Sequence, residues 1–387
     1  MKKFWDKWTE IALVKRILVG LILGAILGIA VPQATGIAIL GDVFVSALKA
    51  IAPLLVFFLV ISSLCNAGKS HGGVIKTVII LYMFSTVLAA VIAVFASMAF
   101  PVKMTLANAA TDTSAPQGIV EVLNNLLLNV VANPVSSLVN ANYVGILMWA
   151  VLLGLAFRAA DKMTKKVLAD VADGISMVVT WIINLAPFGI FGLVFNTVST
   201  NGLDIFTTYG KLLLLLVGCM LFIYFVTNPL LVYWCIRQNP YPLIFHCLKR
   251  SALTAFFTRS SAANIPVNMK VCEEMGLDRD TYSVTIPLGA TINMDGAAIT
   301  ITVMTMATAF TLGIHVDIPT AIILSLLAAL SACGASGVAG GSLLLIPMAC
   351  SLFGISDDIS MQVVAVGFII GVVQDYGESA LNSSSDL

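Results

Sequence analysis

Charged side chains are scarce in this chain, and their scarcity sets its class. Of 387 residues, 10% are charged and 59% are hydrophobic. A soluble domain carries about 25% charged residues, so an ordinary soluble protein is excluded. Apolar runs near the roughly 20 residues that span a bilayer recur along the whole length. The sequence therefore predicts an all-α polytopic membrane protein, with no soluble catalytic domain and no nucleic-acid partner.

Paired cysteines and clustered histidines are also missing. The seven cysteines show no Cys-x-x-Cys spacing, and the three histidines are scattered. Neither a disulfide nor a zinc site is indicated. Because His-Glu-x-x-His does not occur and no nucleophile and base of the right kind stand together, an intramembrane hydrolase is not expected. The chain is predicted not to be an enzyme and to need no cofactor.

Lysine and arginine are distributed unevenly between the loops. If the N-terminus is cytoplasmic and the spans alternate, most basic residues fall inside, while Lys103 and Lys211 fall outside. This asymmetry satisfies the positive-inside rule. It predicts a cytoplasmic N-terminus in a bacterial inner membrane, with an uncleaved first helix.

Apolar runs in the first part of the chain predict six ordinary spans. These cover residues 17–31, 43–65, 74–100, 143–157, 174–198 and 208–236. After residue 240 the pattern changes, because the apolar segment 243–268 carries Arg259 near its middle. An unpaired Arg at the centre of a spanning helix costs at least about 2.5 kcal/mol. A re-entrant hairpin with its tip at this Arg is predicted instead.

A second interrupted segment covers residues 320–352. Small residues from Ala332 to Ser342 separate two apolar runs that are each half a span long. Two broken segments at corresponding places, each followed by a full span, indicate a transporter built from inverted repeats. The expected fold has eight transmembrane helices plus two re-entrant helical hairpins.

The span between the hairpins, residues 286–303, contains the run Asn293-Met294-Asp295. In an intact helix Asn293 and Asp295 would point about 200° apart. Unwinding at this run, between Gly289 and Gly296, would free carbonyls and let both side chains converge. Carbonyl, amide and carboxylate oxygens are hard ligands that suit Na⁺. The alternative is a buried Asp that pairs with an Arg of a neighbouring helix.

The last apolar segment ends in a polar stripe. On a helical wheel Asp375, Ser379, Asn382 and Asp386 fall within about 40°–60° of one another, and Glu378 lies beside them. Counting from Ser360, Asp375 should lie two-thirds of the way through a helix of about 20 residues. Intramembrane carboxylates default to an ion or substrate path. A helix end that emerges into the cytosol is the alternative.

These residues resemble a known family, the sodium-coupled dicarboxylate and amino-acid symporters that have the glutamate-transporter fold. Four regions match its signatures in order over essentially the whole chain. They are Arg259-Ser260-Ser261, the run Leu288–Gly296, the Gly-rich second hairpin, and Asp375 to Asp386. The resemblance implies an elevator-type homotrimer that is driven by Na⁺ as the coupling ion.

The resemblance also implies a role for each matching residue at the substrate site. Asp375 would bind the α-amino group, assisted by Ser379, and Asn382 would bind the α-carboxylate. The two hairpin tips would contribute Ser260, Ser261 and the backbone at Val338.

The resemblance further implies Na⁺ ligands. A first site would use Gly289, Asn293, Asp386 and a carbonyl of Asn382. A second, near the outer hairpin, would use mainly carbonyls, from Thr291, Met294, Ala332, Cys333 and Ala335. A third would join Asp295 with Tyr82, Ser85 and Thr86.

One departure from the family bears on the substrate. Glutamate and aspartate carriers hold an Arg at the position of Glu378, where it forks onto the second carboxylate of the substrate. A carboxylate there repels an acidic substrate by about 4 kcal/mol at about 4 Å and an effective dielectric constant of about 20. Import of serine or threonine is therefore expected. Glu378, paired with Arg259, would accept the hydrogen bond of the substrate hydroxyl.

The resemblance divides the chain into two parts. Residues 1–73 and 101–204 would form the scaffold, and residues 74–100 and 205–387 the moving transport domain. The last helix of the family continues past the position of Leu387, so the chain is expected to be truncated there. A Na⁺- or H⁺-coupled carrier of dicarboxylates or acidic amino acids, with the same fold, is the main alternative. A channel is a further one.

Overall fold

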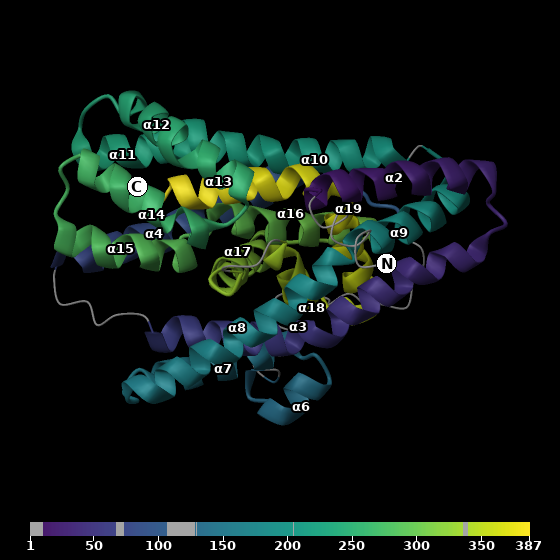
Figure 1. Cartoon of the computed structure of the whole chain (residues 1–387), viewed down its shortest axis with the longest axis horizontal. Helices are drawn as coiled ribbons and strands as arrows, with labels where there is room; N and C mark the ends of the chain where they lie inside the picture. The colour runs from purple at the N-terminus through teal and green to yellow at the C-terminus, as the bar shows by residue number, and fades with distance from the viewer. Residues whose placement is uncertain (1–10, 67–72, 107–127, 129, 204, 336–339) are drawn as a thin grey trace.

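The computed structural model describes residues 11–66, 73–106, 128, 130–203, 205–335 and 340–387, and every regular element in them is a helix (Figure 1). In the first half these are α2 (Leu13–Ala30), the short 3₁₀ turn η1 (Thr35–Ile37), α3 (Ala38–Asn66), α4 (Gly73–Ala99), α6 (Pro134–Val139), α7 (Tyr143–Phe157), α8 (Lys162–Asn184) and α9 (Ala186–Asn201). Those of the second half are α10 (Ile205–Phe222), η2 (Ile223–Thr227), α11 (Asn228–Ile236), α12 (Tyr241–Cys247), η3 (Leu248–Ala252), α13 (Leu253–Thr258), α14 (Ser261–Glu274), α15 (Arg279–Ile292), α16 (Asp295–Thr311), α17 (Ile318–Ala332), η4 (Gly341–Leu345), α18 (Ile346–Ser351) and α19 (Asp357–Ser384).

Several of these helices can cross a membrane. Five stretches of the described chain are long and apolar enough, and a sixth qualifies if the two limbs of α19 count as one span. The multi-pass membrane character is thereby supported, although eight separate spans are not established. The predicted span 174–198 is wrong, because α8 ends at Asn184 and α9 begins at Ala186. Pro187, which has no N–H to continue the helix, stands at the start of α9.

Helix α2 has two contrasting faces. Leu18, Ile22 and Ile26 are exposed, as residues in contact with lipid would be. Gly24 and Gly28 lie on the opposite face against α9, where a Cβ on Gly24 would sit 2.6 Å from the carbonyl oxygen of Phe191. Small residues at four-residue spacing allow two membrane helices to approach closely. The contact between α2 and α9 therefore depends on these glycines.

Replacing Gly24 by Ala is expected to destabilise the protein by about 1–3 kcal/mol, because the added methyl group meets backbone that cannot move aside. The melting temperature in detergent, followed by size-exclusion chromatography after heating, measures this loss. Gly218→Ala in α10 is the matched control, since no atom lies within 4 Å of its added Cβ. Equal melting temperatures for the two variants would contradict the proposed packing.

Two packed helical limbs, named hairpin 1, lie where the first hairpin is predicted. The chain runs through α12, η3 and α13, turns at Arg259 with φ of 52°, and returns as α14. Asn264 on the return limb donates a hydrogen bond to Ser251 Oγ on the outward limb at 2.9 Å and to Ser383 Oγ of α19 at 2.8 Å. Asn268 adds a bond to the carbonyl oxygen of Ser383 at 2.7 Å. These buried amides join both limbs of the hairpin to α19.

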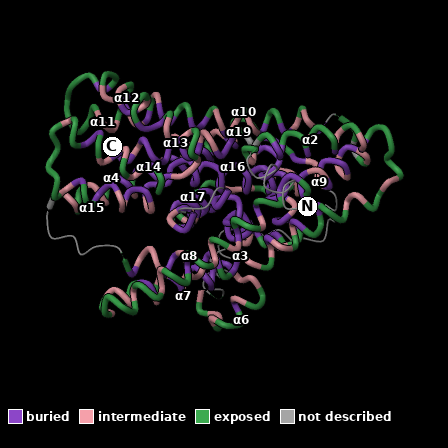
Figure 2. The backbone as a smooth tube through the Cα atoms, in the orientation of Figure 1, coloured by how far each residue is buried: buried purple, intermediate pink, exposed green. Residues whose placement is uncertain are grey.

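The predicted break in the second-half span is also present, with one correction. Helix α15 ends at Ile292, Asn293 and Met294 have non-helical backbone angles, and α16 begins at Asp295. The break thus covers two residues, and Asp295 is the first residue of α16. Every residue of α16 from Asp295 to Ala309 is buried. Figure 2 shows buried backbone gathered around α16 in the middle of the molecule.

Two short helical limbs, named hairpin 2, lie where the second hairpin is predicted. Helix α17 forms the first limb, and η4 followed by α18 forms the second. Residues 336–339, which include the predicted substrate contact Val338, lie outside the described residues. Cys333 Sγ lies 3.7 Å from the carbonyl oxygen of Ile292, so the end of α17 contacts the break between α15 and α16.

The last helix is bent, which the sequence did not predict. The limbs Asp357–Gly371 and Val373–Ser384 of α19 meet at 84°. The depth assigned to Asp375 assumed a straight rod from Ser360, and that assumption is wrong. The polar residues from Asp375 onward instead occupy a separate limb, which lies beside α10 and hairpin 1 in Figure 1.

Candidate functional site

The polar stripe of α19 faces the protein interior. Its members are at most 8% exposed, although they carry carboxylates, an amide and a hydroxyl: Asp375, Glu378, Ser379, Asn382 and Asp386. The first four are helical, whereas Asp386 follows the end of α19 at Ser384. A helix end that emerges into water would leave these groups exposed, so the alternative interpretation of the stripe is not supported.

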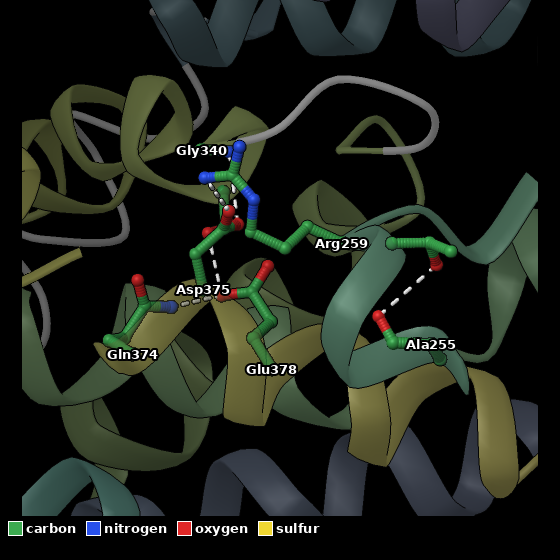
Figure 3. A network of polar contacts seen from close by, with 8 residues as sticks. Ala255, Arg259, Gly340, Gln374, Asp375 and Glu378 are labelled. Carbon is green, nitrogen blue, oxygen red and sulfur yellow. Dashed lines mark hydrogen bonds and ion pairs between the residues drawn. The ribbon is translucent and has the colours of Figure 1, made fainter. Parts of the chain in front are cut away.

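Asp375 joins three elements. One oxygen accepts a hydrogen bond from Arg259 Nη1 of the hairpin 1 tip at 3.4 Å, and the other accepts one from the N–H of Gly340 in hairpin 2 at 3.1 Å (Figure 3). Arg259 also lies over the Tyr376 ring, 5.4 Å from its centroid. The expected pairing of Arg259 with Glu378 is therefore wrong. Neutral side chains donate hydrogen bonds to Glu378, and Arg259 instead pairs with Asp375, about one helical turn before Glu378 in α19.

A cavity of about 30 Å³ lies beside this ion pair, lined by Arg259, Gly340 and Asp375 together with residues of α2, α8 and α9. That volume holds about one or two waters. Because Arg259 and the N–H of Gly340 already bond the two Asp375 oxygens, a substrate that binds this carboxylate has to displace at least one of them.

Glu378 is held by three neutral donors that act on the same oxygen. Thr300 Oγ1 of α16 and Ser342 Oγ of hairpin 2 each donate to Oε2 at 2.8 Å, and Gln374 Nε2 donates to it as well. The sequence analysis missed Thr300, Ser342 and Gln374. Gln374 was detectable, because a residue four positions before Glu378 lies on the same helix face. The other two lie far away in sequence.

The predicted first Na⁺ group comes together around Asp386. Asn293 Nδ2 donates to Asp386 Oδ1 at 3.1 Å, and a Cβ on Gly289 would lie 2.6 Å from the same oxygen. Among the described residues, Asn293 Oδ1 and Asp386 Oδ2 are buried acceptors without a hydrogen-bond partner. Unpaired buried oxygens are costly unless a cation or donor meets them. These residues therefore fit a bound Na⁺.

Replacing Asp386 by Asn is expected to raise the half-saturating Na⁺ concentration for uptake by about tenfold, because the substitution removes one formal charge from a buried cation site. Uptake measured over a series of Na⁺ concentrations, with choline as the replacement ion, determines this value. Asp317→Asn is the control, since Asp317 only caps α17 through Thr320 N. An unchanged Na⁺ dependence in Asp386→Asn would remove Asp386 from the coupling site.

The predicted third group surrounds Asp295, with one difference. Ser85 Oγ and Thr86 Oγ1 of α4 donate to the two Asp295 oxygens at 2.9 and 3.3 Å. Tyr82, however, donates its hydroxyl to the backbone carbonyl of Asp386 at 2.8 Å. The Tyr82 side chain thus connects α4 to the first group.

The remaining predicted residues lie around the same region. Thr291 donates a hydrogen bond from its hydroxyl to the carbonyl oxygen of Leu288 at 2.7 Å. Met294, Ala332 and Ala335 are buried, close to the contact between Cys333 and Ile292. Ser260 caps α14, because its Oγ accepts a hydrogen bond from Ala263 N. Ser261 is buried in the first turn of α14. Asn382 Oδ1 accepts a 2.7 Å bond from Gly296 N. Both hairpins, the broken helix and α19 therefore meet at one place.

Comparison with known proteins shows which family and which relatives the chain is similar to. The family model described as "Sodium:dicarboxylate symporter family" matches residues 13–387. A protein of Bifidobacterium adolescentis, named serine/threonine transporter SstT, is 58% identical over 99% of this chain and 89% of its own length. Proteins of the same name from Streptococcus thermophilus and Streptococcus agalactiae are 55% and 57% identical, over 100% of this chain and 96% of their own.

Proposed function

The chain belongs to the sodium:dicarboxylate symporter family, and we propose that it imports serine and threonine together with Na⁺. It is a transporter and not an enzyme. Three similar proteins that it matches along nearly its full length carry the name serine/threonine transporter. The observation that carries the substrate assignment is Glu378, a buried carboxylate beside Asp375 where acidic substrates would need a cation.

Each end of the substrate has a partner in this proposal. Asp375 binds the α-amino group once Arg259 yields its place, with Ser379 close to the same end. Asn382 is oriented through Gly296 N so that its NH₂ group is left to bind the α-carboxylate. Glu378 Oε1 accepts the side-chain hydroxyl. Ser260, Ser261 and Val338 supply the hairpin tips.

Na⁺ supplies the work of transport. When bound, it contributes positive charge to a site that contains several buried carboxylates. The ligand groups are those of Asp386 with Asn293, of Asp295 with Ser85 and Thr86, and the carbonyls near Cys333. Moving one charge through 100 mV is worth about 2.3 kcal/mol before any concentration gradient is counted. In this proposal, Na⁺ moving down its electrochemical gradient drives substrate uptake.

The proposed mechanism is an elevator in a homotrimer, with the N-terminus in the cytoplasm. Residues 1–73 and 101–204 form the scaffold, and residues 74–100 and 205–387 the transport domain. Lys49 of α3 and Asp358 of α19 form an ion pair of 2.7 Å across this boundary. A cavity of about 200 Å³ also lies there, between α3 and α9 on one side and α10 and α19 on the other. A cavity at this boundary leaves room for the two parts to move against each other, which supports the proposed sliding.

Cross-linking Lys49→Cys to Asp358→Cys is expected to stop uptake almost completely, because the link would fix the transport domain against the scaffold. The measurement uses a cysteine-free background, a short bis-methanethiosulfonate reagent and reversal by dithiothreitol. Arg250→Cys with Glu274→Cys is the matched pair, since both residues belong to hairpin 1 and form an ion pair of 3.3 Å. Continued uptake with the first link in place would disprove the domain boundary.

The deciding test of the substrate is competition in proteoliposomes. Labelled serine uptake is measured with each neutral and acidic amino acid as competitor, and again with Li⁺ or K⁺ in place of Na⁺. Competition by threonine and serine alone, with a requirement for Na⁺, is the expected result. Competition by aspartate or succinate would favour the dicarboxylate alternative. Uptake that does not saturate and shows no counterflow would indicate a channel.

A further inference from the structure

Glu378 is a buried carboxyl group without a cationic partner among the described residues. The residue is 6% exposed, and three donors converge on Oε2. Hydrogen bonds donated to a carboxylate favour its ionised form, whereas burial and a neighbouring carboxylate favour the neutral form. In the described part of the chain, no Lys, Arg or His lies within ion-pair distance of Glu378. When Glu378 is ionised it is a buried charge without a counter-ion, which is costly, and the site is then short of one positive charge.

The nearby guanidinium does not meet that need. Arg259 is bonded to Asp375 at 3.4 Å and lies over the Tyr376 ring. Asp375 and Glu378 together carry two negative charges, and Arg259 carries one positive charge. A zwitterionic substrate such as serine adds no net charge, so the imbalance at Glu378 persists when serine binds.

Glu378 Oε1 is available to accept a hydrogen bond from the substrate. Oε1 receives no hydrogen bond from the residues that the structure describes, because all three donors bond Oε2. In Figure 3 one carboxylate oxygen of Glu378 faces Gln374, and the other is directed toward Arg259. A donor on the β carbon of a substrate held at Asp375 would therefore meet an unoccupied, charged acceptor.

Resting on the proposed function, we propose that the transporter also accepts small α-amino acids with a protonated amino group on the β carbon, of which 2,3-diaminopropionate is the simplest. This compound is serine with an ammonium group in place of the hydroxyl. Its β-ammonium group donates to Glu378 Oε1 and supplies the missing positive charge. Charge-assisted hydrogen bonds are roughly twice as strong as neutral ones.

The test compares β-substituted alanines of similar size as competitors of labelled serine uptake into proteoliposomes. Diaminopropionate is expected to inhibit at a concentration about tenfold lower than 2-aminobutyrate, which has a methyl group instead of the donor. Labelled diaminopropionate is expected to accumulate only with Na⁺. Current recorded with the flux should show one more positive charge per molecule than with serine.

Variants identify the residue responsible. In Glu378→Gln the advantage of diaminopropionate over 2-aminobutyrate is expected to fall at least about fivefold, since the shape is kept and the charge is lost. Glu273→Gln, which removes a carboxylate from an exposed position of α14, should keep the full advantage. These ratios compare competitors on one protein, so a lower yield of folded variant does not alter them.

The outcomes separate the two proposals. If wild-type vesicles take up serine with Na⁺ but diaminopropionate competes no better than 2-aminobutyrate, this inference is overturned and Arg259 moves to Glu378 when substrate arrives. An equal advantage in Glu378→Gln would also overturn it. If serine itself is not taken up, the proposed function fails first.

Discussion

Replacing Asp375 by Asn is expected to lower kcat/KM for serine uptake by at least about 100-fold. The carboxylate is the only acidic group within ion-pair distance of Arg259 among the described residues, and in the proposed function it binds the substrate amino group. Removing one partner of a buried charge pair costs about 3–5 kcal/mol. Initial rates of labelled serine uptake in proteoliposomes, at several serine concentrations, measure the loss.

Misfolding has to be separated from loss of binding in this variant. Asp375→Glu keeps the charge and is expected to fold and to retain measurable uptake, with a raised KM. Arg259→Gln in addition to Asp375→Asn removes both charges and is expected to restore the melting temperature without restoring uptake. If Asp375→Asn alone accumulates serine against its gradient at the normal rate, Asp375 does not bind the amino group.

Replacing Glu378 by Arg is expected to reverse the charge preference of the site. Serine uptake should fall, and aspartate, which Glu378 is proposed to repel, should gain by at least about 100-fold relative to serine. The reason is that about 4 kcal/mol of repulsion at about 4 Å becomes attraction. Gln374 can rotate its amide so that the oxygen faces the new guanidinium. Uptake of labelled aspartate and serine in parallel measures the preference.

The control for this change is Glu378→Gln, which ends the repulsion without supplying attraction. It is expected to weaken serine binding and to leave aspartate a poor substrate. An Arg variant that folds, as judged by its melting temperature, but takes up no aspartate would mean that Glu378 does not face the substrate side chain. In this variant the new Arg lies beside the substrate side chain, so it can bind the second carboxylate of aspartate directly.

The interrupted segments could be predicted because a bilayer penalises them strongly. Arg259 within an apolar run, and the small residues after Ala332, have few solutions other than an interrupted helix, and the structure has helix ends at both places. The break at Asn293 was predicted for another reason, because Asn293 and Asp295 would point about 200° apart in an intact helix. The end of α8 at Asn184 was missed because its apolar sequence continues into α9, and only Pro187 marks the change.

The partners of the site residues were harder to predict than the residues themselves. The stripe from Asp375 to Asp386 follows from helical spacing alone. Which carboxylate Arg259 meets depends on how hairpin 1 lies against α19, and long-range bonds such as Asn264 to Ser383 set that position. Thr300 and Ser342 reach Glu378 through tertiary packing. No periodic pattern in the sequence indicates such contacts.

The bend in α19 divides the helix into two limbs that contact different parts of the protein. The limb before Val372 contacts α3 through Asp358 and through an edge-to-face pair of Phe368 with Phe44. The limb after Val372 contains the polar stripe. In the proposed elevator, substitutions in the first limb are expected to change the rate of transport, and substitutions in the second are expected to change substrate selection. The two properties can change independently, because the limbs on either side of the bend contact different neighbours.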